Sequence, residues 1–126
     1  MSDKKKILVV DDEPDMVTWL TTFLEDNGFV TISAKDGVEA FDKAKSESPD
    51  LITLDVSMDN ESGVKALGKL QRAPETASIP IVMITGVSGD LKRFIDRAKN
   101  LNQPDAFLEK PVDRDELLET ISRLIK

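Results

Sequence analysis

The chain contains no cysteine and no histidine, and these two absences exclude many common kinds of active site. Without cysteine there is no disulfide, no thiolate nucleophile and no zinc–thiolate site. Without histidine there is no Ser-His-Asp hydrolase triad, no HExxH metalloprotease motif and no phosphohistidine carried by this chain. The side chains that remain for chemistry are carboxylates, hydroxyls and lysines.

Long hydrophobic runs and internal repeats are missing as well. No segment is long enough to span a bilayer, so membrane insertion is not expected, and "ILVV" after the basic start is too short for a signal-peptide core. The formal net charge of −7 argues against direct binding of nucleic acid. The length of 126 residues predicts a single domain over 1–126, with no output domain in this chain.

Short apolar segments alternate with amphipathic segments along the chain. This alternation is typical of an α/β fold with a parallel sheet and helices on both faces. Right-handed crossovers leave few topologies, and we expect the flavodoxin-like, doubly wound (βα)5 arrangement with strand order 2-1-3-4-5. Strands are predicted at 6–10, 29–34, 51–54, 79–86 and 106–110, and helices at 14–27, 37–47, 63–72, 90–100 and 113–126.

Folds of this class bind ligands at the carboxyl ends of their strands. Each residue found there, taken alone, is explained by a purely structural role: an acidic helix cap, a turn residue, a β-forming threonine or a solvated lysine. In the predicted strand order, however, four of these strand ends are neighbours. The residues are Asp11 and Asp12 after the first strand, Asp55 after the third, Thr85 in the fourth and Lys110 at the end of the fifth.

The strand-end residues together indicate a cation site. Three carboxylates on adjacent strand ends repel one another, and a fold that brings them together usually neutralises them with a cation. Hard oxygen ligands favour Mg²⁺, held by carboxylates, a carbonyl and water. We therefore predict a Mg²⁺ (or Mn²⁺) site, with Lys110 offsetting part of the remaining charge.

The segments "VVDDE", "LITLD", "ITG" and "LEKP" resemble the receiver (response regulator) domain of two-component signal transduction. The resemblance covers nearly the whole chain and is most like the single-domain chemotaxis regulators. It implies that Asp55 is the phosphoacceptor. It also implies that the metal is held by Asp11, Asp12, Asp55 and the backbone carbonyl of Ser57.

The resemblance further implies which residues respond to the phosphoryl group. Thr85 is the switch hydroxyl that bonds to a phosphoryl oxygen, and Lys110 pairs with the phosphoryl group. The Lys110–Pro111 peptide bond is expected to be cis. Phe107 occupies the aromatic switch position. Such a protein is not a conventional enzyme, because it catalyses only its own phosphorylation and dephosphorylation.

The implied partners are proteins. A histidine kinase or a histidine phosphotransfer protein supplies the phosphoryl group, which fits the absence of histidine here. A downstream target is expected on the face made by helix 90–100, strand 106–110 and helix 113–126, and the location implied is the cytoplasm. Trp19 has two interpretations, partial burial at the edge of the core or a contact with the phosphodonor.

Two alternatives to a stand-alone receiver stay open. The same domain could be cut from a longer DNA-binding regulator or hybrid kinase. A Mg²⁺-dependent phosphatase of the haloacid dehalogenase type also uses a nucleophilic aspartate, but it needs a second acid at the position of Ser57. Asp59 stands where many receivers have proline, and is either a tuning residue or part of a solvated acidic loop.

Overall fold

Five short parallel strands form the centre of the structure, a computed structural model that describes residues 4–55, 62–85 and 104–125. Their order is β2-β1-β3-β4-β5, which confirms the predicted doubly wound sheet. β3 and β4 are buried along their whole length, which explains why both are almost continuously apolar. The strands are β1 (Lys6–Val10), β2 (Val30–Ala34), β3 (Leu51–Asp55), β4 (Ile81–Thr85) and β5 (Ala106–Glu109).

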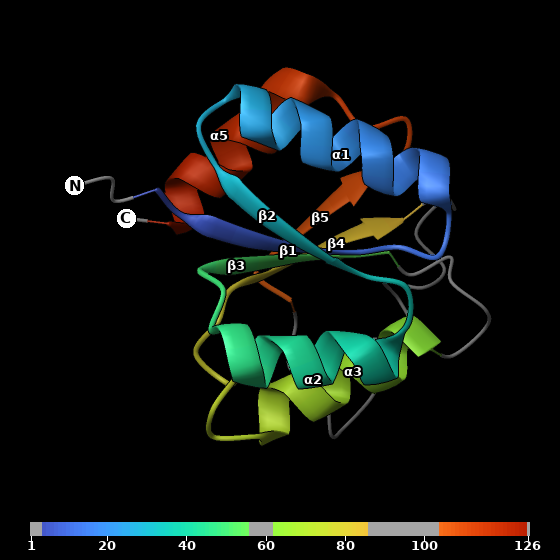
Figure 1. Ribbon diagram of the computed structural model, residues 1–126, viewed down its shortest axis with the longest axis vertical. Helices are drawn as coiled ribbons and strands as arrows, with labels where there is room; N and C mark the ends of the chain where they lie inside the picture. Colours follow the sequence, from blue (N-terminus) through green and yellow to red (C-terminus); the bar gives the residue numbers. More distant parts are fainter. Residues whose placement is uncertain (1–3, 56–61, 86–103, 126) are drawn as a thin grey trace.

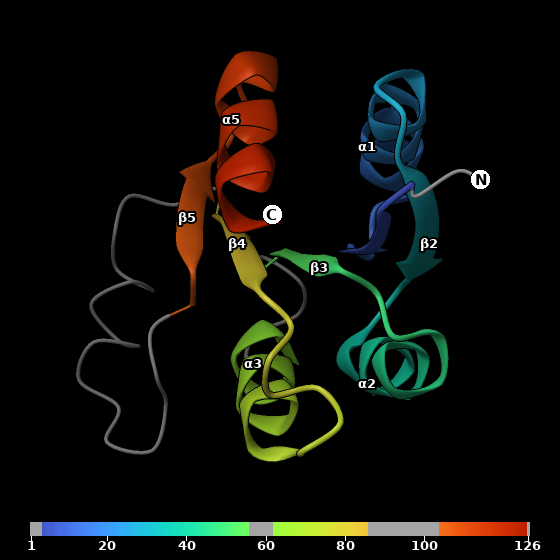
Figure 2. The ribbon, with the colours of Figure 1, turned by 90° about the vertical axis from the view of Figure 1, so that its left-hand side faces the viewer.

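Helices cover both faces of this sheet. The described helices lie on both sides, so that the sheet is the middle of three layers (Figures 1 and 2). The first face carries α1 (Pro14–Asp26) and α5 (Arg114–Leu124), and the second carries α2 (Gly37–Glu47) and α3 (Ser62–Arg72). The helix predicted at 90–100 lies outside the described residues. None of the helices in the described ranges is long and apolar enough to cross a membrane.

The element boundaries follow local signals in the sequence. Pro14 is the first residue of α1 and Asp36 caps α2 by accepting a hydrogen bond from the Glu39 N–H. Gly28 follows α1 with a φ of +92°, a left-handed conformation that glycine adopts without strain. β4 begins at Ile81 and not at residue 79 as predicted, because Pro80 has no N–H to give to a neighbouring strand.

Alternating side chains divide the core into two clusters. Ile52 and Leu54 belong to the cluster beneath α2 and α3, whereas Leu51 belongs to the cluster beneath α1 and α5. Since side chains alternate along a strand, Thr53 and Asp55 share the face of Leu51. The last residue of the central strand therefore projects on the side of the sheet that α1 and α5 cover.

Candidate functional site

Three carboxylates gather where β1 and β3 end. Val10 lies opposite Leu54 in the parallel register, so Asp11 and Asp12 follow β1 at the level of Asp55. One oxygen from each of these carboxylates lies within 4.8 Å of the others. Asp11 and Asp55 are each only 1% exposed, whereas Asp12 is open to solvent. The convergence predicted for these three acids is therefore present.

Asp11 is held by its backbone and by one carboxylate oxygen. Its N–H donates to the Ala34 carbonyl at 3.1 Å, and its Oδ1 accepts the Glu13 N–H at 2.9 Å. Its Oδ2 is buried and has no hydrogen-bond partner among the residues the structure describes. Burial raises the pKa of the Asp11 carboxyl to about 6; the Glu13 N–H opposes this rise and the charge of Asp55 adds to it.

Lys110 brings a positive charge to the same place. Its Nζ lies 3.3 Å from Oδ2 of Asp55 and 3.9 Å from Oε1 of Glu13. Its backbone N–H donates to the Thr85 carbonyl at 2.8 Å, which extends the pairing of β4 with β5 and fixes the lysine at the sheet edge. The Lys110–Pro111 bond is cis, as expected. Sequence reasoning assigned no role to Glu13, although it adjoins Asp11 and Asp12.

Thr85 and Phe107 lie on the other face of the sheet. Thr85 ends β4 and is 6% exposed, and it shares the face of Met83, which belongs to the cluster beneath α2 and α3. Phe107 pairs with Met83 across β4 and β5 and packs against the same cluster. The hydroxyl and the aromatic ring are therefore placed on one face of neighbouring strands. Ser57 and Asp59 lie outside the described residues.

The donor atoms fit a small, hard divalent cation. Three carboxylates supply hard oxygen ligands, and the buried Oδ2 of Asp11 has no competing partner in the described part of the chain. A cation here would also offset the repulsion between Asp11 and Asp55, which the single charge of Lys110 counters only in part. The residues present are thus compatible with Mg²⁺ or Mn²⁺.

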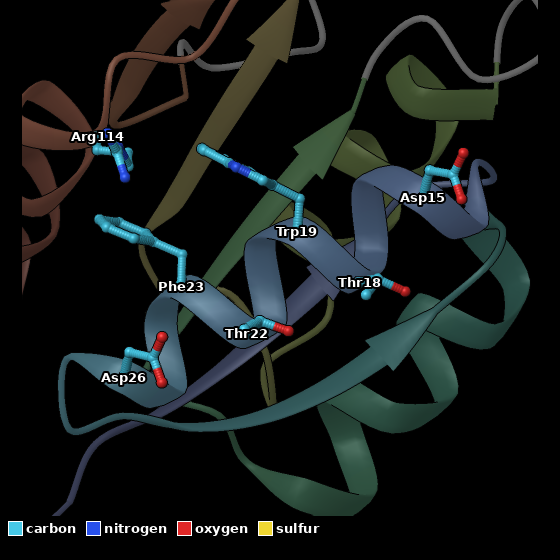
Figure 3. Close-up of a pocket in the computed structure, with 7 residues that line it drawn as sticks. All are labelled: Asp15, Thr18, Trp19, Thr22, Phe23, Asp26 and Arg114. Carbon is cyan, nitrogen blue, oxygen red and sulfur yellow. The ribbon is translucent and has the colours of Figure 1, made fainter.

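A groove lies between α1 and α5. Trp19 is 37% exposed and its ring stacks on Phe23, with ring centroids 5.7 Å apart and an interplanar angle of 11°. Arg114 faces both rings from the start of α5 (Figure 3). The cavity measures about 540 Å³ and is lined by Asp15, Thr18, Trp19, Thr22, Phe23, Asp26 and Arg114.

Besides Glu13, sequence reasoning missed Thr53 and Arg114, which the structure makes prominent. Thr53, in the middle of β3, is 1% exposed and its Oγ1 has no hydrogen-bond partner in the described ranges. In the sequence, Thr53 is recognisable as the one hydroxyl residue in a strand that is otherwise apolar up to Asp55. Arg114 carried no comparable signal, because only packing brings α5 beside α1.

Comparison with known proteins places the chain in a family. Residues 7–122 match the response regulator receiver domain. The protein PilH of Pseudomonas aeruginosa is 30% identical over 120 residues, with 95% of this chain and 97% of PilH covered. The alkaline phosphatase synthesis transcriptional regulatory protein PhoP of Bacillus subtilis is 34% identical over 122 residues, covering 97% of this chain but 49% of PhoP.

Solved structures agree with this assignment. The chemotaxis protein CheY4 of Vibrio cholerae has a TM-score of 0.83 and 28% identity to this chain, with 96% of this chain and 98% of CheY4 covered. The order of strands and the acidic strand ends described above are those expected of the same fold. The chain belongs to the response regulator receiver domains, the signalling modules of two-component systems that are switched by phosphorylation.

Proposed function

We propose that this receiver accepts a phosphoryl group on Asp55 from a histidine kinase or a histidine phosphotransfer protein. The observation that carries the proposal is the placement of the Asp55 carboxylate. It is buried at the end of the central strand, 3.3 Å from the Lys110 ammonium and within 4.8 Å of the Asp11 and Asp12 carboxylates. A rigid carboxylate with a cation beside it is suited to attack on phosphorus.

The proposed transfer is a single displacement. An oxygen of the Asp55 carboxylate forms a bond to phosphorus, and the bond from phosphorus to the imidazole nitrogen of the donor breaks. The leaving imidazole keeps that electron pair and takes up a proton. Lys110 neutralises charge on the transferred group, and most of the rate comes from positioning and electrostatics, as in other phosphoryl transfers.

We propose that Asp11, Asp12 and Asp55 hold Mg²⁺ (or Mn²⁺) together with the backbone carbonyl of Ser57. The buried Oδ2 of Asp11 and the grouping of three carboxylates support this assignment. When bound, the ion supplies positive charge to the phosphoryl oxygens. The role of Ser57 rests on its position two residues after Asp55.

The output of the switch is proposed to pass through Thr85 and Phe107. A phosphoryl group adds roughly −1.5 to −2 of charge and new acceptor oxygens beside the strand ends. The Thr85 hydroxyl moves to bond one of these oxygens, and Phe107 turns into the space that Thr85 leaves. A downstream protein then recognises the face made by segment 90–100, β5 and α5, which is a two-state response to a local change in charge.

The domain is proposed to act in the cytoplasm as a single receiver over residues 1–126 that catalyses only its own phosphorylation and dephosphorylation. One observation favours a second candidate: the chain spans about half of the transcriptional regulator PhoP. The same receiver would then work inside a longer regulator. The length of the native open reading frame distinguishes the two candidates.

The decisive experiment is phosphorylation with a small-molecule phosphodonor and Mg²⁺, followed by intact mass measurement. We expect wild type to gain one phosphoryl group and Asp55→Asn to gain none, because the amide is not a nucleophile toward phosphorus. Asp50→Asn is the matched control, since Asp50 lies before the opposite end of β3. A phosphoryl group on Asp55→Asn, or steady turnover of a phosphomonoester by wild type, would contradict the proposal.

A further inference from the structure

Two buried side-chain oxygens in the described ranges have no hydrogen-bond partner; one lies just after β1 and the other in the neighbouring strand β3. They are Oδ2 of Asp11 and Oγ1 of Thr53. Both residues are 1% exposed. Buried polar atoms are nearly always paired, so two such oxygens on neighbouring segments point to a shared partner, such as a buried water molecule.

The strand register places these two residues beside each other. Thr53 lies opposite Val9 on β1, so Asp11 occupies the next position on the same face of the sheet. Thr53 also precedes Asp55 by two residues on one strand, a separation of about 6.6 Å. The hydroxyl therefore lies one step below the carboxylates, on the face of the sheet from which they project.

The two described residues that pair with Thr53 across the sheet have no polar side-chain atom to offer its hydroxyl. The residues that flank it across the sheet, Val9 and Val82, are fully buried and have hydrocarbon side chains. Valine has nearly the same shape as threonine and would pack at this position without the desolvation of a hydroxyl. Among the strand residues around Thr53, a polar group for its hydroxyl is therefore found at the strand ends, where Asp11 and Asp55 lie.

We propose that Thr53 is a positioning residue for the metal site, whose hydroxyl donates to Oδ2 of Asp11 through one bridging water molecule. Oδ1 of Asp11 already accepts the Glu13 N–H, so this second bond would hold both oxygens of the carboxylate. A carboxylate oxygen has lone pairs for both a hydrogen bond and a metal. The inference rests on the proposed function, because it assigns Asp11 to the cation.

The effect on metal binding follows from how such outer contacts work. Groups that hydrogen-bond to metal ligands orient them, and their removal typically weakens metal binding by about 10- to 100-fold. The Thr53 hydroxyl orients the carboxylate before the cation arrives, so less order has to be gained on binding. Its removal should weaken Mg²⁺ binding without removing any ligand.

The test is calorimetric titration of Mg²⁺ into wild type, Thr53→Val, Thr53→Ser and Thr76→Val. We expect Thr53→Val to bind Mg²⁺ about tenfold more weakly, and Thr53→Ser, which keeps the hydroxyl, to bind like wild type. Thr76→Val is the matched control, since its buried hydroxyl donates to the Leu70 carbonyl at 2.7 Å beyond α3. It should leave Mg²⁺ affinity unchanged. Circular dichroism would check that each variant is folded.

The outcomes separate this inference from the function on which it rests. Wild-type affinity in Thr53→Val, or equal weakening in Thr53→Ser and Thr53→Val, would overturn the role of the hydroxyl while phosphorylation of Asp55 still stands. A wild type that binds no Mg²⁺ would overturn the metal site itself, and the inference with it.

Discussion

At the scale of single residues, the adjacent carboxylates of Asp11 and Asp12 differ in their burial. Asp11 is almost completely buried, and its pKa is raised to about 6 because burial disfavours the charged form. Asp12 lies in solvent although its carboxylate is part of the same group. The protein therefore keeps one acid of the site under electrostatic strain and leaves the other hydrated.

Replacing Asp11 with asparagine should stabilise the metal-free protein at neutral pH. The pKa of Asp11 in the folded protein, about 6, is higher than its ordinary value of 3.8. Protonated Asp11 therefore contributes its full stabilisation below pH 3.8, and this contribution is lost as the pH rises through 6. At pH 7 the ionised carboxyl then costs on the order of 1–3 kcal/mol, which Asp11→Asn avoids while keeping an acceptor for the Glu13 N–H.

Urea unfolding of the metal-free protein at pH 7 and near pH 4 checks this. We expect Asp11→Asn to raise the free energy of unfolding at pH 7 and to change it little near pH 4, where Asp11 is largely protonated. Asp12→Asn is the control, because an exposed side chain has no burial cost to relieve. Equal effects of Asp11→Asn at both pH values would show that burial of charge is not the cause.

At the scale of elements, the start of α1 differs from the starts of α2 and α5. Asp36 and Asp113 each accept a backbone N–H from the first turn of the helix that follows. Glu13 makes no such cap for α1, and its own N–H is used by Oδ1 of Asp11. Residues at this end of α1 thus serve the acidic site in place of capping the helix.

Capping substitutions should reveal this difference. Asp36→Ala removes the hydrogen bond to the Glu39 N–H and should lower the free energy of unfolding by about 1 kcal/mol. Glu13→Ala removes no capping bond, so it should cost less. Chemical denaturation followed by circular dichroism measures both, and equal losses would mean that the side chain of Asp36 does not stabilise α2 as a cap.

At the scale of the whole molecule, the acidic surface and the groove between α1 and α5 define how a partner could approach. The chain carries a formal net charge of −7, and two aspartates border a groove that contains Trp19, Phe23 and Arg114. Exposed tryptophan and arginine are typical of residues that dominate protein interfaces. This groove is therefore a candidate contact for the protein that donates the phosphoryl group.

Trp19→Ala should slow phosphotransfer from a protein donor by about tenfold or more, because interface tryptophans often contribute 2 kcal/mol or more to binding. Phosphorylation by a small-molecule donor should be unaffected, since the acidic site is unchanged. Val38→Ala is the matched control, as Val38 is 64% exposed on α2, across the sheet. Equal slowing with both kinds of donor would mean that Trp19 acts on the site and not on docking.

The sequence alone was enough for the alternation of elements, the strand order and the acidic edge. Runs such as "LITL" are apolar on both faces because parallel strands are buried on both sides, and such strands end at a common edge. Asp55 was predicted just after its strand and is the last residue of β3, so its position was predictable to within one residue. Proline, glycine and aspartate at the helix ends supplied the boundaries.

Only the tertiary structure decided which of these side chains are buried and what they touch. Lys110 reaches Asp55 across 55 positions of sequence, and Arg114 meets Trp19 only because α5 packs beside α1. The burial of Asp11 rather than Asp12, and the burial of the Thr53 hydroxyl, likewise depend on neighbouring strands. Burial and hydrogen bonding are properties of the packed whole, whereas strand and helix patterns are set locally by the order of apolar and polar residues.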